Sequence, residues 1–239
     1  MRKKDIYMNR CWWQMILLPL LTFSLPHLLT LLLLSSCTRD SYEKGEGEYS
    51  YLRGDFAEAF VNSNRQITRI VTDDGDELDL TAPVTASWAD EPDTTYRCRL
   101  YYNKVENKTE VLSIGEVPCL TVHPLPEFEV PLVTDPVTFE STWMSKNGRY
   151  LNVSILIKTG VTNDTSAIQS LGFVTDTIIT HPDNKKIRHI IMHHDQANVP
   201  EHYSTQIYMS IPTEQIDADS VRISINSYDG EVVAKHRVH

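Results

Sequence analysis

The stretch NGRYLNVSILIK, residues 147–158, decides the fold class of this chain. Its Asn147-Gly148 pair favours a two-residue hairpin turn, because both positions of such a turn need a positive φ. Behind the turn, apolar side chains occupy every second position and fall on one face of a strand: Leu151, Val153, Ile155 and Ile157. The stretch therefore predicts a β-hairpin with one buried face.

Short runs of the same kind continue on both sides of this hairpin. Together with it they predict antiparallel strands at 137–144, 150–158, 171–175, 187–192, 203–211, 221–227 and 232–238. Turn-forming residues separate the runs, and the last two strands join through Tyr228-Asp229-Gly230. Seven short strands in about 110 residues favour a β-sandwich.

The preceding part of the chain predicts a smaller β domain. Its expected strands are 56–61, 67–72, 77–81, 96–103 and 109–114. Pro118, Pro124, Pro126 and Pro131 follow closely, and proline cannot donate a hydrogen bond to a sheet. We therefore expect an all-β chain with a domain boundary in this segment, giving one domain at 50–126 and a second at 127–239.

Residues 1–36 have the composition of a signal peptide. A basic start is followed by an apolar run from Met15 to Leu34, which small serines close. A permanent transmembrane helix is the alternative, since about 20 apolar residues span a bilayer. Pro19 and Pro26 interrupt the run and argue for the signal peptide, and Met8 is an alternative start.

Cys37 directly follows this leader. The sequence Leu34-Ser35-Ser36-Cys37 resembles the lipobox at which bacterial lipoproteins are cleaved and at which the cysteine thiol takes up diacylglycerol. We therefore expect acyl chains, palmitate included, on Cys37, followed by a flexible tether over 37–49. The lipid makes the membrane the first partner of the protein. It predicts an outer-membrane location, on the cell surface or on the periplasmic face.

The charge of the chain argues against nucleic acid as a partner. The formal net charge is −10, and removing the leader, which has four basic residues and one acidic residue, changes it to −13. The domain at 50–126 alone has 7 basic and 13 acidic side chains. Such a surface repels phosphate backbones.

Several short motifs follow the lipobox in a fixed order along the chain. They are LSI (112–114), VP (117–118), DPV (135–137), GRYLNV (148–153), IKT (157–159), SLGFV (170–174), HDQ (194–196), SIP (210–212) and NSYDG (226–230). In this order and spacing the chain resembles the NigD-like lipoproteins over nearly its whole mature length. The resemblance implies an OB-like β-barrel followed by an immunoglobulin-like β-sandwich. No molecular activity is established for that family.

Weak candidates for a metal site lie between residues 189 and 202. His189, His193, Asp195 and His202 all have side chains that bind metals. On a strand, His189 and His193 share a face, so a third ligand would have to fold back from Asp195 or His202. No His-Glu-x-x-His pattern is present to hold ligands on a helix. We therefore expect histidines at strand ends and in loops, and neither a metal nor another cofactor.

Two further cysteines remain once Cys37 carries lipid. Cys98 and Cys119 lie in a part of the chain that an oxidising compartment would allow to form a disulfide. A turn near Asn107-Lys108 would bring them almost opposite each other across a hairpin. Two free, buried cysteines are the alternative.

Three short motifs resemble the O-glycosylation motif of exported proteins in related bacteria. They are DTT (93–95), DTI (176–178) and DSV (219–221). The resemblance makes Thr94, Thr177 and Ser220 candidate modification sites.

The sequence lacks the signatures of common enzymes. There is no Gly-x-Ser-x-Gly motif, and nothing selects a carboxylate pair for glycoside hydrolysis. Tyr96, Tyr101 and Tyr102 suggest stacking on sugars, although aromatic residues on strands more often pack against their neighbours.

We therefore expect a non-enzymatic binding or structural module of the cell envelope, with an unidentified protein or glycan as its partner. One alternative is a subunit of a fimbria-like surface assembly, in which exchanged strands join the protomers. A carbohydrate-active or metal-dependent enzyme is a further alternative.

Overall fold

The computed structural model describes residues 52–105 and 108–238. Cys37, the signal peptide expected at 1–36 and the tether expected at 37–49 lie outside the described residues. The part of the chain that is described is all-β, as predicted, with only two short 3-10 helices, η1 (Leu125–Glu127) and η2 (Thr213–Gln215). Within it, no helix is long and apolar enough to cross a membrane.

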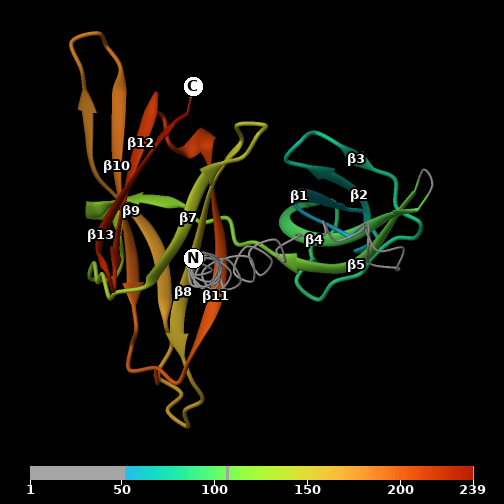
Figure 1. Ribbon diagram of the computed structural model, residues 1–239, viewed down its shortest axis with the longest axis horizontal. Coiled ribbons are helices and arrows are strands. Elements are labelled where there is room, and N and C mark those ends of the chain that lie inside the picture. Colours follow the sequence, from blue (N-terminus) through green and yellow to red (C-terminus); the bar gives the residue numbers. More distant parts are fainter. Residues whose placement is uncertain (1–51, 106–107, 239) are drawn as a thin grey trace, which may run out of the picture. The chain divides into compact units, whose positions relative to one another are not determined.

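The first sheet has the strand order β3-β2-β1-β4-β5 and curls like half of a barrel (Figure 1). Its strands are β1 (Arg53–Val61), β2 (Ile67–Thr72), β3 (Glu77–Leu78), β4 (Thr95–Val105) and β5 (Lys108–Glu116). All neighbours are antiparallel. Alternate residues of the two central strands form its core, where Ala57, Ala59, Cys98 and Leu100 are fully buried.

The loop 79–94 completes this core. Val84 pairs with Ile67 of β2, and Trp88 packs on the buried cluster with its ring in edge contact with Tyr96, at 5.7 Å between centroids. A large aromatic side chain from a loop thus contributes apolar area that five short strands do not supply.

Two further sheets form the predicted sandwich, with the orders β13-β12-β10-β9-β6 and β11-β8-β7. The strands are β6 (Val122–Pro124), β7 (Thr138–Met144), β8 (Tyr150–Thr159), β9 (Ser170–Thr180), β10 (Lys186–Asp195), β11 (Tyr203–Pro212), β12 (Ser220–Ser227) and β13 (Gly230–Arg237). Both sheets contribute to one core. The predicted apolar face of β8 lies in it, since Leu151, Val153, Ile155 and Ile157 are all buried. A hairpin turn does precede β8, with Gly148 at a φ of +70°. The predicted two-residue type is wrong, because Asn147 is not among the residues with a positive φ and the backbone N–H of Ser145 donates to the carbonyl of Tyr150, which leaves four residues in the loop.

The position of β6 corrects the predicted boundary between the domains. Val122–Pro124 pairs with β9, and the backbone N–H of Leu120 donates to the carbonyl of Ser210 in β11, at 2.9 Å. The first sheet ends at Glu116, so the sandwich begins before the predicted boundary at 126. The change of sheet, between Glu116 and Val122, does include the first of the four prolines. The later prolines lie in and after β6, because an edge strand tolerates a residue that cannot donate to a ladder.

Two strand pairs are parallel, β6 with β9 and β10 with β12. The sequence predicted antiparallel sheets throughout. Alternation of apolar residues shows which face of a strand is buried, but it carries no information about the direction of the neighbouring strand.

The segment 125–135, which we call the strap, fastens several of the sequence motifs together. At its end, Val133 O accepts from His194 N at 3.0 Å, and Asp135 N donates to His194 O at 2.9 Å. The Asp135 carboxylate accepts from Gln196 N at 2.8 Å. The backbone N–H of Val137 donates to the carbonyl of Asn226, and the carbonyl of Val137 accepts from Tyr228 N, so Val137 is bonded to the NSYDG motif. The DPV, HDQ and NSYDG motifs therefore meet at one place, which explains why they occur together.

Candidate functional site

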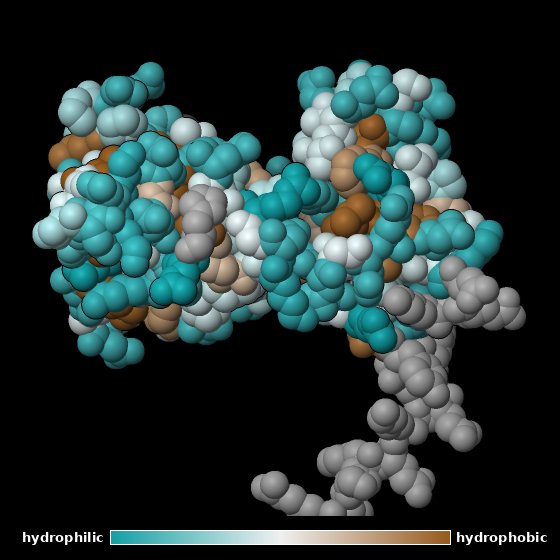
Figure 2. All heavy atoms as spheres, turned by 90° about the horizontal axis from the view of Figure 1, so that it is seen from above, coloured by the Kyte–Doolittle hydropathy of each residue, from teal (hydrophilic) through white to brown (hydrophobic). Residues whose placement is uncertain are grey.

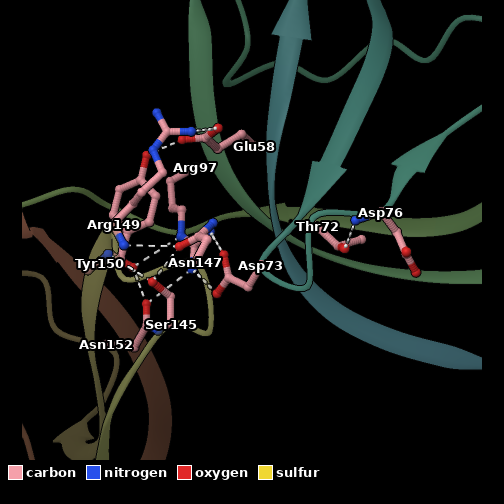
Figure 3. Close-up of polar contacts among 11 residues, drawn as sticks. Glu58, Thr72, Asp73, Asp76, Arg97, Ser145, Asn147, Arg149, Tyr150 and Asn152 are labelled. Atoms are coloured by element: carbon pink, nitrogen blue, oxygen red, sulfur yellow. Dashed lines mark hydrogen bonds and ion pairs between the residues drawn. The ribbon is translucent and has the colours of Figure 1, made fainter.

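A buried polar cluster, which we call the junction, links the curled sheet to the three-stranded sheet of the sandwich (Figure 3). Its centre is Arg97 of β4, whose side chain is 1% exposed. The guanidinium donates to both carboxylate oxygens of Asp73, at 2.5 and 2.6 Å, and to the amide oxygen of Asn152 on β8, at 3.2 Å. Its plane also lies over the ring of Tyr150, 4.1 Å from the centroid. One arginine thus holds two sheets by charge-assisted hydrogen bonds and stacking.

Glu58 of β1 forms the second half of the junction. Its buried carboxylate accepts from Arg149 Nη1 and from the Tyr150 hydroxyl, each at 2.6 Å. Burial, and next the hydrogen bond to Glu58, raise the pKa of Tyr150 well above its usual range, so the phenol stays protonated and keeps donating.

The chemistry of the junction is structural. Each of its buried charges faces an opposite charge with matching hydrogen bonds, as buried ion pairs require. Phe56 adds apolar contact beside it, with its ring in edge contact with Trp143 at 5.3 Å and with Tyr208 at 5.4 Å. The cluster therefore joins the two parts of the fold and leaves no charged group free for a ligand.

The two cysteines flank this junction as separate thiols. Cys98 lies in the core of the curled sheet, where burial raises its pKa to about 12. It pairs across the sheet with Glu116, and the chain then leaves the sheet, so that Cys119 bridges to Ser210 of β11 instead. The disulfide considered from the sequence is therefore absent from the structure. Cys119 lines a cavity of about 160 Å³ together with Arg149 and Tyr150.

A different surface has the features of a binding site. We call it the outer face. It is the side of the sheet β13-β12-β10-β9-β6 that is turned away from the sandwich core. Its residues alternate with core residues such as Ile190, Met192 and Ile223. Two cavities open on it, of about 320 and about 480 Å³, and the strap contributes to both. The face drawn in Figure 2 is largely hydrophilic, with its hydrophobic residues in small groups rather than in one broad patch.

The first cavity is built around an aromatic side chain of the strap. Its lining residues are His123, Glu127, Phe128, Glu129, Val130, Ser170, Leu171 and His193. The Phe128 ring is in edge contact with His193, at 5.0 Å between centroids, and lies 6.1 Å from His123. Gly172 of β9 makes room for it, since a Cβ there would already lie 3.4 Å from the ring.

His193 also shows what this cavity cannot do. Its Nδ1 accepts the backbone N–H of Val133 at 3.2 Å. The neutral ring therefore carries its proton on Nε2, which donates to the Ser170 hydroxyl at 2.9 Å. A nucleophilic serine needs the opposite arrangement, in which the imidazole accepts the hydroxyl proton. Burial lowers the pKa of His193, so the ring remains neutral and acts as a scaffold between strap and sheet.

The second cavity lies where β9 bulges. The pairing of β9 with β10 shifts between His189 and Ile190, which leaves Asp176 without a residue opposite it. The cavity is polar: its lining residues are Thr134, Asp176, His189, Ile190, Ile191, Ser224, Asn226 and Glu231. The Nε2 atom of His189 is buried there and has no hydrogen-bond partner. Asp176 and Glu231 are exposed, so neither carboxylate has the apolar surroundings that a general acid requires.

The structure separates the four weak metal candidates. His193 lines the first cavity and His189 the second. Asp195 accepts from Ala197 N at 2.8 Å, and His202 is exposed beside Gly160. Among the described residues, no group of three His, Cys, Asp or Glu side chains is placed to hold a metal ion.

The candidate glycosylation sites lie in different surroundings. Thr177 is exposed on β9. Thr94 is half-buried and donates to the carbonyl of Pro92 at 3.1 Å. Ser220 is half-buried at the start of β12.

The three tyrosines do not gather into a platform for a sugar. Tyr102 is fully buried in the core of the curled sheet, and its hydroxyl donates to Asp55 at 2.8 Å. Tyr96 packs against Trp88, and Tyr101 lies under Arg99 at 4.8 Å. Aromatic residues on strands serve as packing partners here.

Sequence reasoning did not identify the strap side chains as site residues. The segment PEFEVP (126–131) places one aromatic side chain between two carboxylates in a proline-rich segment. That pattern could have indicated a binding segment, but the prolines favoured a domain boundary instead.

Solved structures with the same fold include proteins from several species of Bacteroides. A NigD-like immunity protein from Bacteroides caccae ATCC 43185 is 19% identical, with 77% of this chain and 91% of that chain covered and a TM-score of 0.58. A protein of unknown function, DUF1344, from Bacteroides vulgatus ATCC 8482 is 16% identical, with 77% and 90% covered and a TM-score of 0.57.

A third protein, provisionally named a lipoprotein, from Bacteroides fragilis NCTC 9343, is 12% identical, with 78% and 99% covered and a TM-score of 0.55. No protein-family model and no curated protein matches the sequence. The chain therefore has the fold of a NigD-like protein, which confirms at the level of the fold the resemblance found in its sequence.

Proposed function

We propose that the mature chain is a cell-envelope lipoprotein, anchored by lipid on Cys37, that binds another macromolecule on its outer face without catalysing a reaction. The observation that carries this proposal is the hydrogen bonding of His193 in the first cavity. His193 is held neutral with its proton directed at Ser170, so the group best placed to act as a base is used as a support. Around it lies a cavity lined by acidic, aromatic and aliphatic side chains, which supports recognition of a partner.

The scaffold supports a binding role. Both cavities lie on one sheet, and the junction holds that sandwich to the curled sheet through buried ion pairs. Sites built on strands are held more precisely than sites on loops, and a preformed site loses less entropy when it binds. The similarity to proteins named as an immunity protein and as a lipoprotein agrees with an envelope-associated binding protein.

The fimbria-like alternative finds no support in the sandwich edges. Strand exchange needs an open edge with a groove beside it. Here the segment around Cys119 and Leu120 pairs with Ser210 at one side. At the other side, the Thr142 hydroxyl and the His236 ring lie 2.7 Å apart and join β7 to β13. Among the described strands, the chain itself therefore pairs with part of the β11 edge, and side chains join the end strands β7 and β13.

The lipid anchor is tested by a cysteine substitution. We expect Cys37→Ser to remove the acyl chains and to move the protein from the membrane fraction to the soluble envelope fraction. Mass spectrometry of the wild-type N-terminal peptide should show diacylglycerol on Cys37. An unmodified Cys37 in a protein that still sediments with membranes would contradict the lipoprotein assignment.

The binding face is tested by photo-crosslinking in intact cells. A benzoylphenylalanine at exposed Val130 or Val233, which lie on the strap and on β13, should give a crosslinked product of constant mass. The same probe at exposed Leu52 or Leu112, just before β1 and on β5 of the curled sheet, provides the matched control. Equal products from all four positions, or none from the outer face, would refute this surface as the binding site.

A further inference from the structure

The first cavity carries a negative charge that no ion-pair partner among the described residues balances. Glu127 and Glu129 both line it and both are exposed. Neither forms an ion pair with a described residue. The nearby carboxylates of Asp135 and Asp195 add to the negative potential, because both act electrostatically on His193. His193 itself stays neutral and does not offset them.

Apolar surface accompanies this charge. The Phe128 ring lies between the two glutamates in the sequence, and Leu171 lines the cavity beside it. Leu125 and Val130 of the strap are 44% and 49% exposed. Apolar side chains so open to water are an energetic cost that binding a partner would remove.

These two features select one class of ligand. An anion would be repelled by the carboxylates, and a purely apolar ligand would remove water from them without compensation. A side chain with an apolar stem and a cationic head satisfies both, since its stem packs on Leu125 and Val130 and its head meets Glu127 and Glu129. An aromatic ring near the cation adds attraction.

We propose that the first cavity receives a lysine or arginine side chain of a partner protein. The inference rests on the proposed function and specifies the chemistry of its partner. The acidic chain, with a formal net charge of −10, also attracts a basic segment from a distance.

A peptide titration tests the proposal on the full mature protein in lipid nanodiscs. The probes are acetylated and amidated tripeptides with Leu at both ends and Lys, Arg, norleucine or Glu in the centre, together with maltotriose. We expect the Lys and Arg peptides to give saturable NMR shifts of the Leu125, Val130 and Leu171 methyl groups. The norleucine peptide, which has a similar stem without the charge, should bind at least tenfold more weakly, and the Glu peptide should give no shift.

Variants identify the groups responsible. The double variant Glu127→Gln/Glu129→Gln should weaken binding of the Lys peptide at least tenfold, and Phe128→Leu should weaken it several-fold. The double variant Glu110→Gln/Glu140→Gln removes the same charge from exposed positions outside the cavity and should leave binding unchanged. Stronger shifts at 20 mM salt than at 500 mM should accompany an electrostatic interaction.

Several results would overturn the inference. Equal binding of the Lys and norleucine peptides would make the cavity a purely apolar site, and shifts from maltotriose alone would make it a glycan site. An equal loss in the Glu110/Glu140 control would mean that only net charge matters, and an absence of any shift would mean that the cavity is closed to side chains. The titration needs no native partner, so it can fail while crosslinking from the outer face succeeds, which leaves the proposed function standing. If the titration succeeds and crosslinking fails, the proposed function falls instead.

Discussion

At the scale of single residues, Arg97 has the largest structural role in the junction. Its buried guanidinium neutralises Asp73 and bonds Asn152 on the opposite sheet. Lysine could not replace it, because a single ammonium lacks the planar fork that meets both carboxylate oxygens. Lys146 and Asp74 also form an ion pair, at 2.7 Å, but both side chains are exposed to solvent, whereas Arg97 is buried.

We expect Arg97→Ala to lower the free energy of unfolding by about 3 kcal/mol, because it leaves the Asp73 carboxylate poorly solvated and without its partner. Lys146→Ala, the matched control, should give no measurable change, since exposed ion pairs contribute little. Urea unfolding followed by tryptophan fluorescence measures both. Equal effects of the two substitutions would contradict a structural role for burial of Arg97.

The buried His193 and the half-buried His236 are expected to make stability depend on pH. Burial lowers the pKa of His193 and of His236 below the ordinary value of 6.5. As pH falls below 6.5, the unfolded chain therefore takes up protons at these positions before the folded chain does, and stability decreases. The free energy of unfolding should fall between pH 7 and pH 5.5, and this slope should be shallower in the variant His193→Gln/His236→Gln. An unchanged slope would show that other groups cause the dependence.

At the scale of elements, the strap supplies Phe128 and the two glutamates that line the first cavity of the outer face. It leaves β6, places Phe128 over Gly172, and is fixed at its end by the hydrogen bonds of Val133 and Asp135 with His194. Gly172 has no positive φ, so backbone geometry does not call for glycine there. A Cβ at this position would just meet the Phe128 ring at 3.4 Å, whereas a larger side chain would enter the space of the ring.

Substitutions at Gly172 test whether the position of Phe128 depends on the space beside this glycine. We expect Gly172→Leu to displace Phe128, because its side chain would occupy the space of the ring, and to expose the strap to cleavage by a Glu-specific protease at Glu127 and Glu129. Gly172→Ala is the control, since its Cβ would lie at an ordinary contact distance of 3.4 Å. If protease digestion proceeds at the same rate in both variants, Phe128 does not depend on that space.

At the scale of the whole molecule, the curled sheet and the sandwich share buried groups. Phe56 and Arg97 of the curled sheet contact Trp143, Tyr208 and Asn152 of the sandwich. Contacts of this kind couple the unfolding of two parts, whereas domains joined only by a linker unfold independently.

Calorimetry tests this coupling. The wild-type protein should unfold in one cooperative transition with equal calorimetric and van't Hoff enthalpies. The double variant Phe56→Ala/Arg97→Ala should show two transitions, because each core remains intact while only the Glu58 half of the junction still joins them. Two transitions in the wild-type protein would mean that the junction contributes no coupling.

The sequence by itself determined the fold class and most strands of this protein. Alternation in residues 147–158 identified the buried face of β8, since the period of a strand is a local property of the chain. Only the tertiary structure decided what lies against the other face of that strand, because Asn152 owes its burial to Arg97, which is distant in sequence. It also decided the parallel pairing of β6 and the position of Phe128. Direction of pairing and convergence of side chains depend on contacts between distant segments, which local periodicity does not encode.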